Sequence, residues 1–124
     1  MLALLRVALV LIAAAVAAVG LFRDVVLTGE RTFFGHYDNQ VQAFPWLWRT
    51  VLAWRAGVPP LWDFTTYCGT TFPGEVQTAP FYPGHLLLAF LGCAPGQACF
   101  DRYVVAHAAL AMAGMVLCLR VRGA

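Results

Sequence analysis

Two uninterrupted apolar segments constrain the fold of this 124-residue chain more than any other feature. The first runs from Leu2 to Phe22, and at ~1.5 Å per residue a helix of that length reaches about 30 Å, the thickness of a bilayer's hydrocarbon core. The second, Tyr103 to Leu119, lies near the lower length limit for a span. Hydrophobic residues make up 61% of the chain and charged residues 11%, against roughly 25% charged in soluble domains. The sequence therefore predicts an all-α membrane protein, with spanning helices over residues 1–22 and 102–119.

The first segment has a competing interpretation as a cleaved secretory leader. Arg6, an apolar centre and the small residues at 15–17 all fit a leader. The apolar centre of a leader is usually only roughly 7–15 residues long, however. A retained helix is therefore favoured, and a secreted protein without it is the alternative.

A third apolar segment, residues 81–95, is bracketed by prolines. Its apolar part has only about 10 residues, too few for a full span. The length suits a short interfacial or re-entrant helix instead.

The arginines predict an orientation for the two spanning helices. Arg6 flanks the first helix, and Arg120 and Arg122 flank the second. If residues 81–95 do not cross, all three arginines lie on one side, which the positive-inside rule makes cytoplasmic. We therefore expect residues 23–80 to form a long extracytoplasmic loop, with both termini, including the end at 120–124, in the cytoplasm.

The loop contains a predicted amphipathic helix over about residues 40–56. Apolar residues recur there at helical spacing, and Gly57 followed by two prolines marks the end. Its three tryptophans suit a helix lying at the level of the lipid headgroups. The pattern indicates a juxtamembrane helix, and an amphipathic surface helix is the plainer interpretation.

Asp38 stands just before this helix and has two interpretations. An aspartate at that position is a good helix N-cap. A carboxylate at the membrane surface can also act as a general base, because partial desolvation tunes its pKa. The two roles are compatible.

Residues 60–84 lack a helical period and are rich in proline, glycine and aromatic side chains. An ordered loop of this length is usually functional. With the apolar segment that follows, it reads PLWDFTTYCGTTFPGEVQTAPFYPGHLLLAFL. This stretch resembles the first outer loop of the YfhO-type bacterial multispanning membrane proteins. The matching positions are Pro60, Leu61, Trp62, Gly69, Gln77, Tyr82, Pro83, Leu86 and Leu87, and upstream Asp38, Gln40 and Pro45.

The resemblance covers roughly residues 1–120, with four departures in the loop. Asp63 stands where the family usually has Asn, Phe64 where it has Pro, Cys68 where it has Gly, and Thr71 where it has Pro. These departures bear on the local turn geometry.

The resemblance implies the N-terminal part of a fold of the GT-C glycosyltransferase type. Such enzymes transfer a sugar from a polyprenyl-phosphate donor to an acceptor outside the bacterial cytoplasmic (inner) membrane. It implies Asp38 as the general base in an outward-facing site with the loop from Trp62 to Tyr82. The substrate-binding residues that we expect for this site are Gln40, Trp62, Asp63, Gln77 and Tyr82.

The family has about ten or more spanning helices by the same resemblance, so we expect this chain to be an N-terminal fragment that is inactive alone. Its partners would be the bilayer, a lipid-linked sugar donor and further membrane helices. The alternative is a small stand-alone membrane scaffold without catalysis. A net charge of +2 is too small to indicate nucleic-acid binding.

The remaining reactive side chains give weaker signals. Cys93 and Cys99 would lie in an oxidising compartment, where they can form a disulfide or stay free. No CxxC pair indicates a zinc site. Asp63 and Glu75 could hold a divalent metal or make local turn hydrogen bonds, and His36 could join Asp38 in an acidic or metal site. No cofactor is evident from the sequence, and a divalent metal is an alternative without further support.

Overall fold

The computed structural model describes residues 2–122, with side chains from residue 4 onward, so the outermost residues of the predicted 1–22 and 120–124 segments lie outside the description. The described chain is mostly helical. Two of its helices are long and apolar enough to cross a membrane. These findings confirm the predicted helical class with two candidate spans, and they favour a membrane location.

The chain divides into two compact units. Met1–Phe33 and Gln97–Ala124 form the helix-pair unit, and Phe34–Gly96 form the loop unit.

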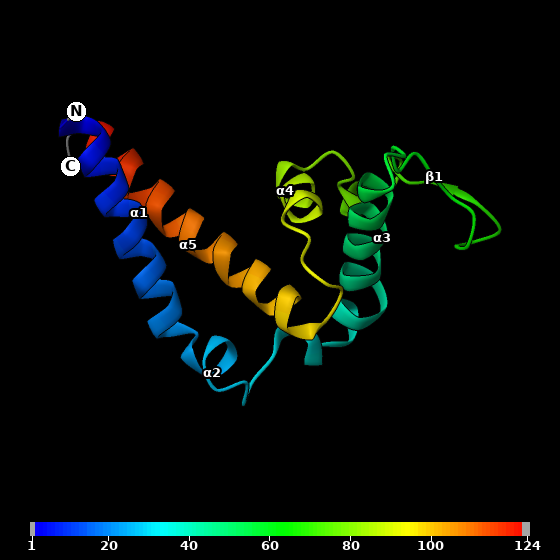
Figure 1. The fold of residues 1–124 in the computed structure, drawn as a ribbon, viewed down its shortest axis with the longest axis horizontal. Coiled ribbons are helices and arrows are strands. Elements are labelled where there is room, and N and C mark those ends of the chain that lie inside the picture. The colour runs from blue at the N-terminus through cyan, green and yellow to red at the C-terminus, as the bar shows by residue number, and fades with distance from the viewer. Residues whose placement is uncertain (1, 123–124) are drawn as a thin grey trace. The chain divides into compact units, whose positions relative to one another are not determined.

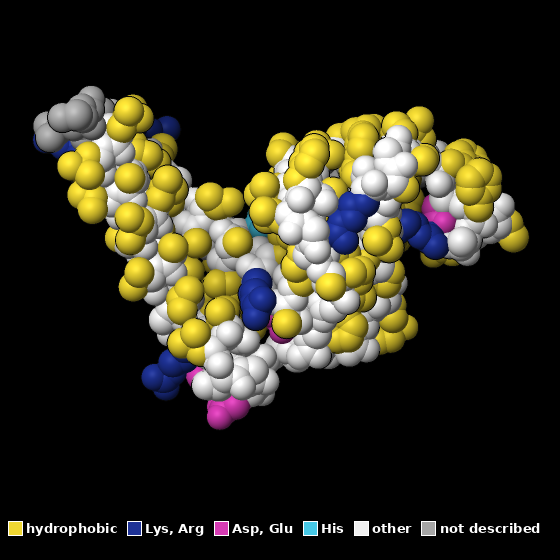
Figure 2. All heavy atoms as spheres, viewed as in Figure 1, with side chains coloured by type: hydrophobic (Ala, Val, Ile, Leu, Met, Phe, Trp, Pro, Cys, Tyr) yellow, Lys and Arg dark blue, Asp and Glu magenta, His cyan; other side chains and the backbone are white. Residues whose placement is uncertain are grey.

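The helix-pair unit is built on α1 (Leu2–Leu21) and α5 (Gln97–Val121), which run antiparallel (Figure 1). Val10 and Ala14 of α1 pack against Ala113 of α5, and such small side chains let helices approach closely. The short helix α2 (Arg23–Val26) contacts both. Hydrophobic side chains cover much of the outer surface of the pair (Figure 2), among them Leu4, Leu5, Ile12, Val16, Leu110 and Met115.

Helix α5 begins at Gln97, five residues before the start predicted at residue 102. Gln97 and Asp101 interrupt the apolar pattern before residue 102, although Cys99 and Phe100 between them are apolar and buried. Asp101, which is buried, accepts hydrogen bonds from Thr32 Oγ1 (3.1 Å) and from the backbone N–H of Phe33 (2.9 Å). The first turns of α5 therefore bind the connector that follows α2.

The loop unit has its longest helix where an amphipathic helix was predicted. A 3₁₀ turn, η1 (Phe33–Gly35), leads into a π-helical segment, η2 (Asn39–Ala43), and then into α3 (Phe44–Arg55). Pro45 lies in the first turn of α3, where its missing N–H is tolerated. The buried face of α3 carries Leu47, Trp48, Thr50 and Val51.

Helix α4 (Pro83–Leu91) packs against α3 in the same unit. It has 9 residues, so it is only about 14 Å long, less than half of the hydrocarbon core. It ends at Gly92, whose φ of 66° is the left-handed conformation that glycine adopts readily. Arg55 of α3 donates to the backbone carbonyls of Leu88 (3.0 Å), Ala89 (3.2 Å) and Cys93 (2.6 Å).

The rest of the loop unit contains a small hairpin that the sequence pattern did not predict. Strands β1 (Trp62–Asp63) and β2 (Thr70–Thr71) pair antiparallel, with Trp62 opposite Thr71 and Asp63 opposite Thr70. A 3₁₀ turn, η3 (Val76–Thr78), follows. Strands of two residues are too short to show an alternating pattern, which explains why periodicity missed them.

Candidate functional site

A buried carboxylate organises the hairpin of the loop unit. The side chain of Asp63 is only 2% exposed and forms an ion pair with Arg49 of α3. Its Oδ1 accepts from the backbone N–H of Thr65 (2.8 Å) and from Thr65 Oγ1 (2.9 Å), and its Oδ2 accepts from Thr66 Oγ1 (2.5 Å). Arg49 also donates to Thr65 Oγ1. One carboxylate thus joins α3 to the turn that follows β1.

The chemistry of Asp63 follows from these contacts. Burial alone would raise its pKa, but the hydrogen bonds from Thr66 and Thr65 and the charge of Arg49 together lower the pKa to about 2. A carboxylate with so low a pKa is a poor proton acceptor near neutral pH. Asp63 therefore fits the role of an anchor for Arg49 and does not fit that of a general base.

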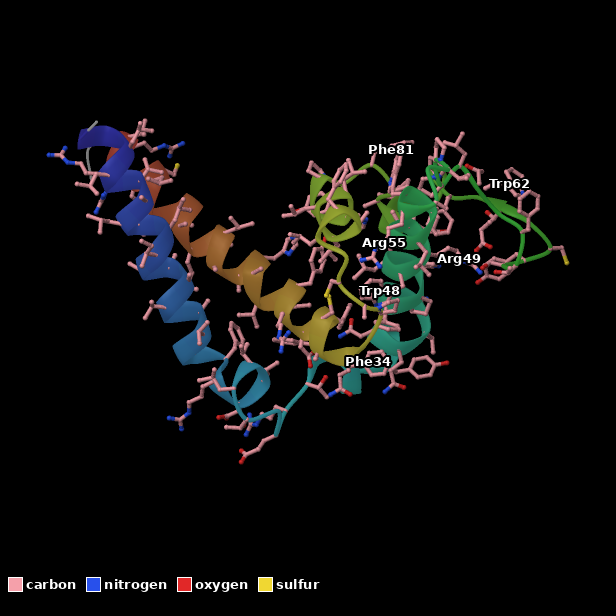
Figure 3. The ribbon with its side chains drawn as sticks, in the orientation of Figure 1. Phe34, Trp48, Arg49, Arg55, Trp62 and Phe81 are labelled. Carbon is pink, nitrogen blue, oxygen red and sulfur yellow. The ribbon has the colours of Figure 1, made fainter. Side chains whose placement is uncertain are left out.

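A cleft of about 690 Å³ lies between α3 with its preceding π segment and the turn after β1. That volume is typical of small-molecule sites, which occupy about 300–1,000 Å³. The lining combines aromatic and aliphatic side chains with a few polar groups: Val41, Gln42, Pro45, Trp46, Trp48, Arg49, Leu52, Thr65, Thr66 and Tyr67. In Figure 3 the Arg49 side chain extends from α3 toward the hairpin that carries Trp62.

Arg49 is the side chain through which the cleft can bind an anion. Its side chain is 39% exposed, whereas that of Asp63 is 2% exposed. A ligand in the cleft therefore meets the guanidinium and not the carboxylate. Aromatic faces such as that of Trp46 suit the apolar face of a sugar ring or a lipid chain, and Gln42 can hydrogen-bond hydroxyl groups.

The turn at the rim of the cleft has an unusual backbone. Tyr67 (φ 52°) and Cys68 (φ 62°) both adopt the left-handed conformation, followed by Gly69 at φ 115°. A Cβ at Gly69 would lie 3.1 Å from Trp62 Nε1, so the glycine lets the indole cover the turn. Phe64 and Tyr67 remain 82% and 89% exposed. The rim thus presents aromatic side chains to the surroundings.

Of the predicted substrate-binding residues, Asp63 contacts Arg49, Thr65 and Thr66 in the wall of the cleft. Gln40 is exposed in η2, and Trp62 is half-exposed on β1. Gln77 is exposed in η3, and Tyr82 precedes α4 with its ring 5.4 Å from that of His85. Within residues 4–122, none of these four side chains lines the cleft.

Asp38, the predicted general base, lies one turn before Gln42, which lines the cleft. Its side chain is 69% exposed, with Oδ2 3.9 Å from Nδ1 of His36. Its backbone is already helical, and the carboxylate makes no capping hydrogen bond. The N-cap interpretation is therefore wrong in this structure, because the helix begins before Asp38.

Sequence reasoning missed the residues that line the cleft, among them the three that contact Asp63, which are Arg49, Thr65 and Thr66. In the sequence, Arg49 is only a charged residue between the apolar positions of the predicted helix over residues 40–56. The run Asp63-Phe64-Thr65-Thr66 does carry a signal, because an aspartate often accepts the backbone N–H two residues later. The pairing with Arg49, 14 positions earlier in sequence, had no such local signal.

The cysteines and potential metal ligands add no second site. Cys93 and Cys99 are each disulfide-bonded, whereas Cys68 and Cys118 are exposed free thiols. Within the described part of the chain, no group of three or more His, Cys, Asp or Glu side chains could hold a metal ion. The predicted alternative of a divalent metal at Asp63 or Glu75 therefore gains no ligand set from these residues.

Comparison with known proteins adds no relative. No protein-family model, curated protein or solved structure matches the chain. The YfhO-type resemblance therefore stays a prediction from the motifs in residues 1–120.

Proposed function

We propose that the loop unit binds the sugar-phosphate headgroup of a lipid-linked donor at the outer surface of the bacterial cytoplasmic membrane, as one part of a GT-C-like glycosyltransferase. The observation that supports this most directly is the cleft with Arg49 at its wall. A guanidinium pairs well with phosphate oxygens, and the neighbouring aromatic side chains suit the apolar parts of such a ligand.

The proposed topology draws support from the helix-pair unit. Arg6 of α1 and Arg120 of α5 line the same groove, so they lie at the same end of the antiparallel pair. The positive-inside rule makes that end cytoplasmic. The connections at the opposite ends of α1 and α5 would then lead to an extracytoplasmic loop unit.

Asp38 stays the candidate base in this proposal. Its position one turn before Gln42 would leave its carboxylate close to a ligand in the cleft. A base must reach the acceptor hydroxyl within hydrogen-bond distance, and this geometry depends on the bound acceptor. Glycosyl transfer by Asp38 would require that acceptor and further helices.

The alternative function is that of a membrane scaffold whose loop binds without catalysis. Its specific support is that Asp38 is highly exposed, and that Asp63, the acid at the cleft, has a pKa of about 2. Neither carboxylate therefore has the environment of a general base in this chain alone.

Titration of the full chain in nanodiscs with a polyprenyl-phosphate sugar tests the binding step. Trp46 and Trp48 line the cleft, so tryptophan fluorescence should change on binding. Arg49→Ala should weaken binding about tenfold or more, since a charge-assisted hydrogen bond contributes about 1.5–3 kcal/mol. Arg31→Ala, an exposed arginine outside the cleft, should bind normally. Equal affinity of the two variants would contradict the proposal.

Catalysis is tested separately. Asp38→Asn should retain donor binding, and should abolish sugar transfer in a chain that carries the additional helices. Normal transfer by Asp38→Asn would remove the base and leave the binding function intact. Normal binding without transfer in the unsubstituted chain would favour the scaffold.

A further inference from the structure

The helix-pair unit contains a groove that the proposed function does not use. The groove lies between α1 and α5 and has a volume of about 1110 Å³. Its walls are apolar, with Leu9 and Ala13 from α1 and Met112 and Met115 from α5, and Arg6 and Arg120 lie among its lining residues. We propose that this groove binds one anionic phospholipid of the cytoplasmic leaflet, with its phosphate at the two arginines and an acyl chain along the helices.

The dimensions of the groove fit one leaflet. Along α1 the lining extends from Arg6 to Ala17, which at ~1.5 Å per residue is about 16 Å. Along α5 it extends from Met112 to Arg120, or about 12 Å. Half of a hydrocarbon core of about 30 Å is about 15 Å. An acyl chain of a phospholipid has that reach, whereas a further spanning helix would continue across the other leaflet.

The floor of the groove exists because the facing side chains are small. Ala13, Ala14 and Ala17 line it from α1, and Ala14 packs in the core with Ala113. Methionine side chains on the α5 wall are flexible and adapt to irregular apolar ligands. The groove is therefore a space that a flexible chain can fill.

The charge of the groove selects the headgroup. Arg6 and Arg120 are both exposed, and within residues 4–122 no carboxylate forms an ion pair with either. Two guanidinium groups at the membrane surface attract an anionic lipid, with about a fivefold gain in affinity for each basic residue. A zwitterionic lipid lacks this net attraction. The occupant is therefore an anionic phospholipid and not simply any lipid.

Native mass spectrometry of the full chain released from nanodiscs tests this proposal. The nanodiscs contain equal amounts of phosphatidylglycerol, the anionic probe, and phosphatidylcholine, the zwitterionic one. The unsubstituted chain should retain phosphatidylglycerol preferentially. The double variant Arg6→Ala/Arg120→Ala should lower that preference about 25-fold, the product of two fivefold effects.

The matched control is Arg23→Ala/Arg31→Ala, which removes the same charge from two exposed residues outside the groove. It should change the preference by less than about twofold, since neither arginine reaches the groove. Ala13→Leu narrows the groove and should reduce retention of both lipids. The result for Ala13→Leu is interpreted only if the variant is as resistant to protease as the unsubstituted chain, which shows that it is folded. The arginine variants test the proposal in either case.

Three outcomes would overturn the proposal. The first is equal retention of the two lipids by the unsubstituted chain, and the second is an equal loss of preference in the two double variants. The third is retention of a second copy of the chain, sensitive to Ala13→Leu, in place of lipid. Because the inference depends on the membrane location and on the proposed orientation, and not on glycosyl transfer, failure of donor binding at Arg49 would leave it standing.

Discussion

In the helix-pair unit, α1 and α5 meet through alanine and valine side chains, whereas in the loop unit α3 is joined to its neighbours by directed polar contacts. Ala14 and Ala113 exemplify the first kind of contact. Three residues of α3 make the second kind of contact. Arg49 forms an ion pair with Asp63, Trp54 Nε1 donates to the carbonyl of Pro80 (2.8 Å), and Arg55 donates to the carbonyl of Leu88. Packing of small residues suits helices surrounded by lipid, which supplies no hydrophobic drive for association. Polar contacts suit an irregular loop, whose backbone would otherwise lack fixed partners.

The unfolding of the two units can be measured separately. All four tryptophans, Trp46, Trp48, Trp54 and Trp62, lie in the loop unit. Tryptophan fluorescence therefore reports the unfolding of the loop unit, while circular dichroism is dominated by the long helices α1 and α5.

The largest expected effect distinguishes buried from exposed leucines. Leu47 of α3 is 4% exposed, and Leu5 of α1 is 57% exposed. Leu47→Ala should destabilise the loop unit by about 2–5 kcal/mol, because it leaves a cavity. Leu5→Ala leaves no cavity and should leave the fluorescence transition unchanged. Equal shifts would mean that the two units do not differ as described.

The next effect tests the ion pair under the cleft. Asp63→Ala should destabilise the loop unit by about 2–3 kcal/mol, less than the 3–5 kcal/mol typical of a fully buried pair because Arg49 is partly exposed. Glu75→Ala is the matched control, since Glu75 is an exposed acid in the same loop. The transition measured by fluorescence should shift for Asp63→Ala alone.

The same carboxylate predicts a dependence on pH. Folding lowers the pKa of Asp63 from 3.8 to about 2. Its contribution is therefore complete above about pH 4, and it is lost as the pH falls through about 2. The loss should be about 2 kcal/mol, because a tenfold change in the proton affinity of a group corresponds to about 1.36 kcal/mol. In the Asp63→Asn variant this part of the acid dependence should be absent from the fluorescence transition.

The local elements of the fold could be predicted from the sequence. The two long apolar helices follow directly from residue type, because length and hydropathy are local properties of the chain. The helix at α3 was predicted near its observed bounds by the spacing of its apolar residues, although the π segment η2 was not. Both features depend on near neighbours in sequence.

The site was less predictable because its contacts are not local. Asp63 was identified as a site residue, but Arg49 was not, because their pairing requires the hairpin to fold back onto α3. Trp62, Gln77 and Tyr82 belong to one motif, yet none of these three side chains is among the residues that line the cleft. A motif gives the order of residues, and the turns between them decide which side chains meet.

A smaller effect is expected at the junction of α3 and α4. Arg55 donates to three carbonyl groups at the end of α4, where a cation also interacts favourably with the helix dipole. Arg55→Ala should cost about 1–2 kcal/mol. Hydrogen exchange should then quicken at the amides of residues 87–91. Arg55→Lys keeps the charge but has a single ammonium group, so it should restore only part of the protection, and full protection in Arg55→Ala would show that the contacts contribute little.

The smallest effect concerns the turn at the rim of the cleft. Gly69→Ala places a Cβ 3.1 Å from Trp62 Nε1, in a backbone conformation with φ 115° that favours glycine. Gly57→Ala is the control, since Gly57 also has a positive φ (71°) but nothing within 4 Å of its added Cβ. Each substitution should cost about 1 kcal/mol through the backbone. Only Gly69→Ala should also displace the indole of Trp62 and change the tryptophan emission of the folded chain. If both variants kept the original emission, the position of the Trp62 indole would not depend on Gly69. The rim of the cleft would then be less rigidly packed than the ion pair between Arg49 and Asp63.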